Sequence, residues 1–394
     1  MCRLDCPHLK ACGGCAFGKW SYAETLREKE NQVRQLLRPF CRVEGIEGMD
    51  APFHYRNKVH VCVGRGRDGG IVTGIYARDS HRIVPVQSCA IHDRKADETI
   101  GVIRQLAQDF SIEPYDEDRG TGLLRHILIR TAHATGEMLV TLVIGKPAFA
   151  NRSAFVSALV RRCPWVRTVA VSLNGQHTSM ILGKSTRTVY GPGYIEDTLL
   201  GMRFALGPDS FYQVNPAQTE KLYAKALSLS GLTGTETAVD AYCGIGTIGL
   251  CASGQAGRVI GVEVNENAVR DAVHNARRNG VTNASFIAAD AAAWMRGPGR
   301  EVKADVVFMD PPRAGSSESF LFSLLRMRPK RIVYISCNPV TLARDLKILS
   351  RQYRAEAAYP FDLFPWTEHV ETVCCLYHQK KDFISVPYEP KNVE

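Results

Sequence analysis

A cysteine and a carboxylate near the end of the chain have the residue types that nucleophilic catalysis needs. Cys337 lies in the sequence Ser336-Cys337-Asn338-Pro339, directly after the apolar run 331–335, and Glu371 precedes another apolar run. A thiolate can add to an electrophilic carbon, and a carboxylate can remove a proton. Because a cysteine at the end of a strand is more often a small buried hydrophobe, its chemistry depends on its neighbours.

Cys337 belongs to a pattern of apolar runs that alternate with helical segments. Such a pattern indicates a parallel sheet covered on both faces, with ligands bound beyond the carboxyl ends of the strands. The chain can return Glu371 to that same edge, just before its last strand. We predict strands at 237–242, 258–264, 284–288, 304–309 and 331–335, and helices at 215–229 and 267–279.

Carboxylates stand at the ends of successive predicted strands. A glycine turn at 240–247 follows the first strand, Glu263 ends the second, and Asp290 and Asp310 follow the third and fourth. The glycines let a ligand approach the backbone closely. The carboxylates can accept hydrogen bonds from ribose hydroxyls and from an adenine amino group. This arrangement suits a nucleoside joined to a sulfonium amino acid, so we predict S-adenosylmethionine as the cofactor.

These groups together could methylate carbon 5 of uracil. That carbon is too weak a nucleophile until a thiolate such as that of Cys337 adds to carbon 6 and generates an enolate. A base such as Glu371 must then remove the proton on carbon 5 so that the thiolate can leave. Because a free thiol titrates near ~8.5, we expect Arg313 or the backbone amides of the 338–339 turn to stabilise the thiolate.

The composition bounds the class of protein. A chain of 394 residues is long enough for two or three domains, and 45% hydrophobic with 23% charged residues predicts a packed core. The net charge of +9 favours a polyanionic partner. Residues 1–10 lack the apolar core of a signal peptide, and no run approaches the roughly 18 apolar residues of a membrane helix. We therefore expect a cytoplasmic protein without a membrane partner.

The region 53–189 follows a different pattern. Short β-rich runs such as 58–63 and 137–144 are interrupted by helical stretches at 98–110 and 152–163. This order is typical of an α+β domain built on an antiparallel sheet.

Three cysteines near the N-terminus are spaced like metal ligands. Cys6, Cys12 and Cys15 lie within ten residues in a glycine-rich segment, and cytosolic cysteines are more often ligands than disulfide partners. Sites with four thiolates hold either zinc or an iron-sulfur cluster, and the spacing does not choose between them. Candidate fourth ligands are Cys2, Cys41, Cys62 and Cys89.

Six motifs stand out along the chain: Ser210-Phe211-Tyr212-Gln213-Val214-Asn215, the turn 240–246, Gly261-Val262-Glu263, Asp310-Pro311-Pro312-Arg313, Ser336-Cys337-Asn338-Pro339 and His369-Val370-Glu371. Together they resemble the RNA uridine carbon-5 methyltransferase family, which includes transfer-RNA and ribosomal-RNA enzymes. The resemblance covers almost the whole chain. It implies a C-terminal class I, Rossmann-like α/β domain with a mostly parallel seven-stranded sheet.

The resemblance also implies roles for individual residues. Cys337 would be the nucleophile and Glu371 the base, and Phe211 would lie near the target base. The segments 55–58 and 124–126 resemble parts of the family's RNA-facing domain. Thr247 departs from the asparagine of some relatives. The residues that would bind the methyl donor are Gln213, Tyr242, Thr247, Glu263, Asp290 and Asp310.

The ribosomal members of the family carry a four-iron cluster on this cysteine pattern, with a distant fourth ligand that matches Cys89. The resemblance thus implies a 4Fe-4S cluster at Cys6, Cys12, Cys15 and Cys89, which transfer-RNA members generally lack. We predict a monomer that acts on 23S ribosomal RNA and not on DNA. Its expected parts are a cysteine-cluster module at 1–40, a central RNA-binding α+β domain at 41–205 and the methyltransferase domain at 206–394.

Four other functions fit parts of the sequence. The turn at Gly244, Gly246 and Gly249 also fits a dinucleotide fingerprint, but a nicotinamide enzyme leaves Cys337 unexplained. Amino-group methylation of adenine pairs Asp-Pro-Pro with an aromatic residue, whereas Arg313 follows here. A transfer-RNA uridine methyltransferase and a non-catalytic iron-sulfur assembly factor that binds RNA stay as alternatives.

Overall fold

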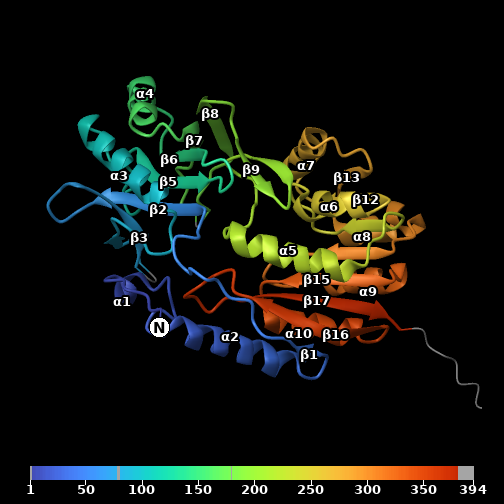
Figure 1. Cartoon of the computed structure of the whole chain (residues 1–394). Coiled ribbons are helices and arrows are strands. Elements are labelled where there is room, and N and C mark those ends of the chain that lie inside the picture. The colour runs from blue at the N-terminus through green and yellow to red at the C-terminus, as the bar shows by residue number, and fades with distance from the viewer. Residues whose placement is uncertain (1, 78–79, 179, 380–394) are drawn as a thin grey trace, which may run out of the picture.

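The computed structural model describes residues 2–77, 80–178 and 180–379, and these form two large β-sheets and one two-stranded sheet, with helices packed around them. Figure 1 shows one sheet at the upper left, the other on the right, and a long N-terminal helix below. Two chain segments far apart in sequence meet in the lower layer, because the N-terminal helix α2 (Tyr22–Leu37) packs against α10 (Pro339–Leu349).

The sheet on the right has eight strands in the order β1-β16-β17-β15-β14-β11-β12-β13. Its pairs are parallel except for those of β17, which runs antiparallel to both β15 and β16. This is the predicted mostly parallel sheet of seven strands, to which the two-residue strand β1 adds an eighth. The strands are β1 (Arg42–Val43), β11 (Thr237–Asp240), β12 (Arg258–Glu263), β13 (Ala284–Ala288), β14 (Val306–Met309), β15 (Arg331–Ser336), β16 (Tyr353–Phe361) and β17 (Glu371–His378).

Helices cover both faces of this sheet, as its continuous apolar strands require. One face is covered by α2, α8, α9 and α10, and the other by α5, α6, α7 and the hairpin of β9 and β10. Figure 1 shows α5 lying across the front of the sheet. The bounds are α5 (Pro216–Ser230), α6 (Thr247–Ala252), α7 (Glu266–Arg278), α8 (Ala291–Arg296), α9 (Glu318–Met327), β9 (Ile195–Leu199) and β10 (Met202–Leu206), with short 3-10 turns η1 (Ser253–Gln255) and η2 (Pro298–Glu301).

The second sheet has seven strands in the order β4-β3-β2-β5-β6-β7-β8 and is antiparallel except for the pair of β6 and β7. Two helices supply the buried apolar side chains that pack on it. The expected α+β architecture built on an antiparallel sheet is observed. The elements are β2 (Lys58–Arg65), β3 (Ile71–Tyr76), β4 (Ile83–Pro85), α3 (Arg94–Asp109), β5 (Leu124–Thr131), β6 (Met138–Ile144), α4 (Arg152–Arg162), β7 (Val166–Leu173) and β8 (Ser185–Tyr190).

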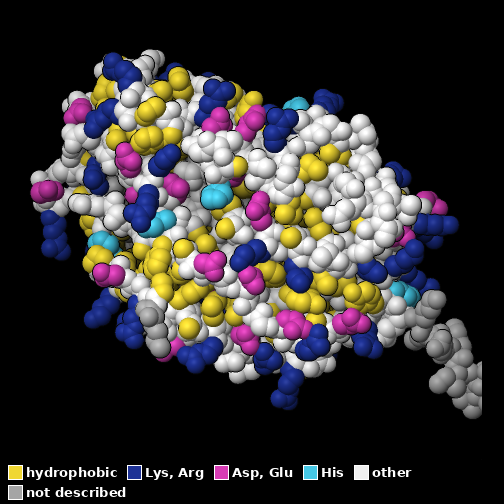
Figure 2. Space-filling view, in the orientation of Figure 1, with side chains coloured by type: hydrophobic (Ala, Val, Ile, Leu, Met, Phe, Trp, Pro, Cys, Tyr) yellow, Lys and Arg dark blue, Asp and Glu magenta, His cyan; other side chains and the backbone are white. Residues whose placement is uncertain are grey.

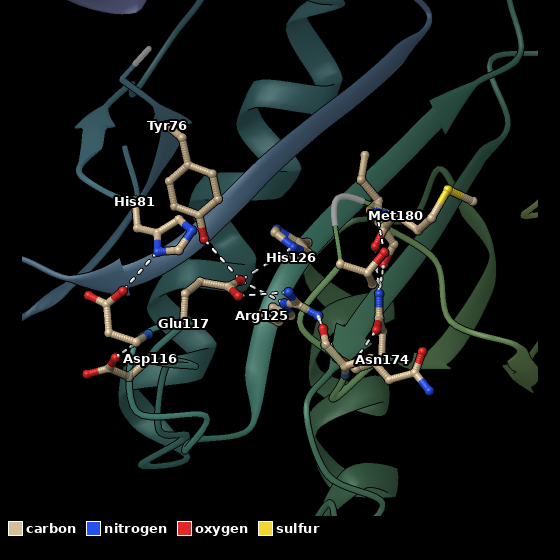
Figure 3. Close-up of polar contacts among 12 residues, drawn as sticks. Tyr76, His81, Asp116, Glu117, Arg125, His126, Asn174 and Met180 are labelled. Atoms are coloured by element: carbon tan, nitrogen blue, oxygen red, sulfur yellow. Dashed lines mark hydrogen bonds and ion pairs between the residues drawn. The ribbon is translucent and has the colours of Figure 1, made fainter. Parts of the chain in front are cut away.

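A buried polar network holds loops of this second sheet. Arg125 donates from Nε and Nη2 to both oxygens of Glu117, at 2.7 Å each, and from Nη1 to the carbonyl of Asn174 at 2.9 Å. Figure 3 shows these contacts. The hydroxyl of Tyr76 donates to the same carboxylate, and the Nε2 atom of His126 lies 3.9 Å from it. The segment 124–126 thus directs its Arg and His side chains into the protein, where they position loops.

Helix α2 is fixed by its cap and by its buried face. The side chains of Ser21 and Glu24 form a capping box at its start. Its buried positions follow the helical period of three and four residues, and one of them is a lysine. They are Tyr22, Thr25, Lys29, Val33 and Leu37.

Lys29 forms an ion pair with Asp362 that no solvent reaches. Its Nζ lies 2.6 Å from Asp362 Oδ1, with both side chains 0% exposed, and it also donates to the carbonyl of Phe364 at 3.0 Å. The hydroxyl of Tyr22 donates to the other oxygen of Asp362 at 2.8 Å. Since β17 begins nine residues after Asp362, this network connects the N-terminal helix to the loop that leads to Glu371.

The predicted domain boundaries at 40/41 and 205/206 stay predictions. The helix of the expected N-terminal module shares a hydrophobic core with the methyltransferase sheet through Val33 and Leu37. Residues 380–394 of the expected C-terminal domain lie outside the described residues.

The surface in Figure 2 has Lys and Arg side chains spread along its outline and interspersed with Asp and Glu. On this face the positive charge is therefore not gathered into one stripe. Among the residues that the structure describes, no helix has both the length and the apolar composition needed to cross a membrane.

Replacing Lys29 with Met should destabilise the fold by about 3–5 kcal/mol, because Asp362 would be left as a buried unpaired charge. The matched control is Arg34→Met on the same helix, which breaks the exposed Arg34–Glu30 pair and should cost under about 1 kcal/mol. Urea unfolding followed by circular dichroism measures both. Equal small losses for the two variants would contradict a structural role for the buried pair.

Candidate active site

Cys337 and Glu371 meet at the carboxyl edge of the parallel strands. Cys337 directly follows β15, and Glu371 is the first residue of β17. These two strands are antiparallel, and Ser336 pairs with Thr372. The register therefore places Cys337 beside Glu371. The sheet thus places a thiol beside a carboxylate, as the sequence predicted for this edge.

The thiol of Cys337 is protonated in the free protein. Burial raises its pKa to about 12, and the nearby charges of Glu371 and Asp310 act in the same direction. The backbone and Arg313 lower the pKa, but they do not outweigh burial. The expected help from Arg313 is therefore present but insufficient by itself, so attack by the thiol requires a further positive charge or a proton acceptor.

Glu371 is a carboxyl group without a solvent shell. Glu371 is only 2% exposed, and its Oε2 has no hydrogen-bond partner among the described residues. Burial, followed by the charge of Asp310, raises its pKa well above the ordinary value. A buried carboxyl with a free oxygen can serve as a base whose basicity exceeds that of an exposed glutamate.

Asp310 follows β14 and continues this cluster of acidic groups. Burial, then the charge of Asp240, raises its pKa to about 7, and the hydrogen bond from Gln213 Nε2 at 3.5 Å lowers it. Asp240 ends β11 and also has a pKa raised to about 7 by burial. Carboxylates this close favour a cationic ligand, because a positive charge would relieve their mutual repulsion.

The other predicted cofactor residues surround the glycine turn. Glu263 ends β12 and accepts from the backbone amide of Gly244 at 3.1 Å, which fixes the carboxylate against the turn. Thr247 begins α6, and its hydroxyl lies 3.5 Å from that of Tyr223. Gly244 and Gly246 have φ of 53° and 87°, a left-handed backbone that other residues rarely adopt.

Tyr242 and Asp290 follow β11 and β13, the strands on either side of β12. The hydroxyl of Tyr242 donates to Ser316 Oγ at 3.3 Å, and burial raises its pKa to about 12. Asp290 is the N-cap of α8, where one oxygen accepts from the amide of Ala293 at 2.8 Å. The second carboxylate oxygen of Asp290 has no hydrogen-bond partner within the described part of the chain, so it can accept from a ligand such as an amino group.

Phe211 lies two residues before Gln213, and the segment 55–58 of the central domain contacts this part of the chain. Phe211 is 68% exposed, so its ring is accessible to a ligand. The side-chain amide of Asn57 donates to the carbonyl of Gln213 at 3.1 Å, and Tyr55 donates to the carbonyl of Pro365 at 3.1 Å. The central domain thereby holds both the Gln213 segment and the loop before Glu371.

The four predicted cluster thiols influence one another's charge. Burial first, and then the charges of Cys89, Cys12 and Cys6, raise the pKa of Cys15 to about 12. Cys6 and Cys89 also line a cavity of about 920 Å³. A Cβ on Gly14 would meet the sulfur of Cys12 at 3.3 Å, so this turn favours glycine.

The structure does not confirm the predicted cysteine-cluster module. Over the described ranges, no set of three or more His, Cys, Asp or Glu side chains is arranged to hold a metal ion. The 4Fe-4S cluster at Cys6, Cys12, Cys15 and Cys89 therefore stays a prediction.

Cys89 has an additional partner in His92. Burial raises the pKa of this thiol, but the hydrogen bond and charge of His92 outweigh it, so that the pKa is lowered. Asp97 accepts from His92 Nδ1 at 2.8 Å and from the backbone amide of Cys89 at 2.7 Å. Of the candidate fourth ligands, Cys89 is therefore the one near the N-terminal thiols whose thiolate is stabilised.

Comparison with known proteins identifies the family. The model of the tRNA (Uracil-5-)-methyltransferase family matches residues 135–380. The chain belongs to this family. An uncharacterized RNA methyltransferase of Halalkalibacterium halodurans is 40% identical over 383 residues, covering 95% of this chain and 83% of that protein. Another from Listeria innocua is 40% identical over 380 residues, covering 94% and 83%.

A solved structure has the same fold. The Pyrococcus abyssi tRNA (uracil-54, C5)-methyltransferase in complex with S-adenosyl-L-homocysteine superposes with a TM-score of 0.76 at 27% identity, covering 92% of this chain and 85% of that one. The prediction of an S-adenosylmethionine-dependent RNA (uracil-5-)-methyltransferase is confirmed. The nicotinamide and adenine-methylation interpretations are thereby set aside.

Sequence reasoning missed two groups of residues in this methyltransferase. The buried pair Lys29–Asp362 was not anticipated, although a lysine within the apolar series of a helix signals a buried partner. Helix α2 was also not expected near the nucleophile, yet it forms one wall of a pocket at Cys337.

Binding of S-adenosylmethionine should weaken as the pH falls below about 7. Asp310 has a pKa of about 7, so it is increasingly neutral at lower pH, whereas the positive sulfonium favours the ionised carboxylate. We expect an increase in Kd of up to about tenfold per pH unit on the acid side, with protons released on binding. Isothermal titration calorimetry over a pH series measures both.

S-adenosylhomocysteine is the control ligand, because its sulfur is neutral and should give a shallower pH dependence. An Asp310→Asn variant should flatten the dependence for the sulfonium ligand. Identical slopes for the two ligands would contradict electrostatic relief at this edge of the sheet.

Proposed function

We propose that this enzyme methylates carbon 5 of a specific uridine in 23S ribosomal RNA, with Cys337 as nucleophile and Glu371 as base. The observation that carries the proposal is the pairing of these two side chains at the carboxyl edge of the sheet, across the register of β15 and β17. The charges of Glu371 and Asp310 both raise the pKa of the thiol, which supports the placement of all three groups at one site.

The chemical steps follow from these residues. Cys337 gives its proton to solvent and its sulfur bonds to carbon 6, so the electron pair of the double bond between carbons 5 and 6 moves into the enolate. Carbon 5 then displaces the methyl group from the sulfonium of S-adenosylmethionine, which leaves as S-adenosylhomocysteine. Glu371 takes the proton from carbon 5, the ring double bond reforms, and the thiolate of Cys337 is expelled.

The methyl donor brings a positive charge to a site where acidic groups repel one another. That charge lowers the pKa values of Cys337 and Glu371 toward those that the reaction needs. We assign donor binding to residues around the glycine turn and at the strand ends: Gln213, Tyr242, Thr247, Glu263, Asp290 and Asp310. Phe211, exposed beside this edge, is assigned to the target base.

We further propose that Cys6, Cys12, Cys15 and Cys89 hold a 4Fe-4S cluster, which the ribosomal branch of the family carries and which favours 23S ribosomal RNA as substrate. The proposal is supported by the mutual proximity of these thiols and the cavity beside Cys6 and Cys89. Such a cluster would cross-link the N-terminal segment to the central domain. We place the enzyme in the cytoplasm as a monomer.

A transfer RNA is the second candidate substrate. The solved structure with the same fold is named as an enzyme of uracil 54 in tRNA, and it covers 92% of this chain. Mapping 5-methyluridine in the 23S and transfer RNA of cells that lack this protein distinguishes the two, because the modified site is lost from only one of them.

Replacing Glu371 with Ala should trap a covalent adduct between protein and RNA, because the methylated intermediate cannot lose its proton. The adduct is detected as a slow band on a denaturing gel after incubation with unmodified 23S RNA and S-adenosylmethionine. A Cys337→Ala change in the same variant should abolish the band. Normal methylation without any adduct in the Glu371→Ala variant contradicts the assigned roles.

Anaerobically prepared protein should contain about four iron and four sulfide ions per chain, as expected for one cluster. A Cys89→Ser variant should lose most of the iron, whereas Cys163→Ser, in the buried thiol at the end of α4, should retain it. Chemical assays of iron and of acid-labile sulfide measure this. Zinc without sulfide would overturn the cluster assignment.

A further inference from the structure

A pocket of about 380 Å³ opens at Cys337, and its two walls come from opposite ends of the chain. The sheet edge supplies Cys337, Arg313 and His369, and the N-terminal segment supplies Phe17 and one face of helix α2. The volume lies within the range of about 300–1,000 Å³ that is usual for ligand sites. A nucleotide beside the target uridine would enter this space.

The α2 wall is a row of polar side chains at regular helical spacing. Glu28, Asn31, Gln32 and Gln35 follow one another by three, one and three residues, so they share one face of the helix. All four are exposed, while the opposite face of α2 is buried. The Lys29–Asp362 pair on that buried face fixes the rotation of the helix and thereby the direction of this row.

These four side chains make no hydrogen bond or ion pair within the described parts of the chain. Their neighbour Arg34 is instead paired with Glu30 at 2.6 Å. The row contains three carboxamides and one carboxylate but no cation, so it is unsuited to phosphate. Carboxamides pair with base edges by donating and accepting together, and a carboxylate accepts from base amino groups.

Aromatic and basic groups complete the pocket. Phe17 stacks on Trp20 with ring centroids 4.6 Å apart, and Trp20 is an exposed aromatic side chain. The guanidinium of Arg313 lies 3.0 Å from His369 Nδ1, at the mouth of the pocket beside Cys337. Proteins read unpaired RNA by this combination of aromatic stacking, base-edge hydrogen bonds and a nearby cation for the backbone.

We propose that the row Glu28, Asn31, Gln32 and Gln35 is a base-reading subsite, which binds an unpaired nucleotide adjoining the target uridine and so determines which uridine reaches Cys337. The inference rests on the proposed function, because it requires RNA at Cys337. It adds to that function a specificity role for the N-terminal helix, which lies outside the matched residues 135–380.

The test uses full-length protein and synthetic hairpin RNAs that carry the mapped uridine in their loop. Each nucleotide that flanks the uridine is replaced in turn by the other three, and single-turnover methylation rates are measured. Native protein should prefer one base at a flanking position by about 10- to 100-fold. A variant with Asn31→Ala, Gln32→Ala and Gln35→Ala should lose most of this preference while still methylating the least favoured RNA at its original rate.

The matched control is the Gln255→Ala variant, which should keep the full preference. Gln255 is an exposed amide that precedes β12, at the amino ends of the parallel strands and away from Cys337. Unchanged affinity for S-adenosylmethionine shows that the triple variant is folded. An unaltered flanking-base preference in the folded triple variant overturns the subsite. Absence of methylation by the native protein on every RNA, with no adduct in Glu371→Ala, sinks the proposed function instead and the subsite with it.

Discussion

The buried contact between Lys29 and Asp362 connects the parts of this methyltransferase. A charge pair without solvent is stable only where its geometry is fixed and its remaining hydrogen bonds are satisfied. Here the Tyr22 hydroxyl and the carbonyl of Phe364 complete those hydrogen bonds. The network therefore fixes the position of α2 relative to the loop before β17. That loop also receives hydrogen bonds from Asn215, Tyr55 and the backbone of Phe17. The first residue after this loop in regular structure is Glu371, so each of these contacts helps to position the Glu371 carboxyl group.

The edge of the sheet presents a second constraint, which is the repulsion among its acids. Asp240, Asp310, Glu371 and Cys337 all have raised pKa values, with burial as the first cause. In the free protein these raised pKa values favour the neutral forms of the four groups. A bound cation would lower the pKa values, so the positive sulfonium of the methyl donor is suited to this edge of the sheet.

The sequence was sufficient for the methyltransferase core and for the residues at its edge, because both depend on local patterns. Apolar runs and helical periods located β12, β13 and α7 to within a residue or two, and strand ends located Glu263, Asp310 and Cys337. The eighth strand, β1, could not be predicted, since two residues carry no pattern and their pairing with β16 spans over three hundred positions. For the same reason Asp362 gave no sign of its partner. The pKa of Cys337 was also beyond the sequence, because burial outweighs Arg313 only in the folded molecule.

Strand β1 has a consequence for how the chain is made. Arg42 and Val43 pair with Ala357 and Ala358, and α2 packs on α10, so the N-terminal segment has its partners near the opposite end of the chain. During synthesis the first forty residues leave the ribosome long before those partners exist. The contacts of β1 and α2 can therefore form only after β16 and α10 have been synthesised. Because α2 is one wall of the pocket at Cys337, that pocket is also complete only after these contacts form.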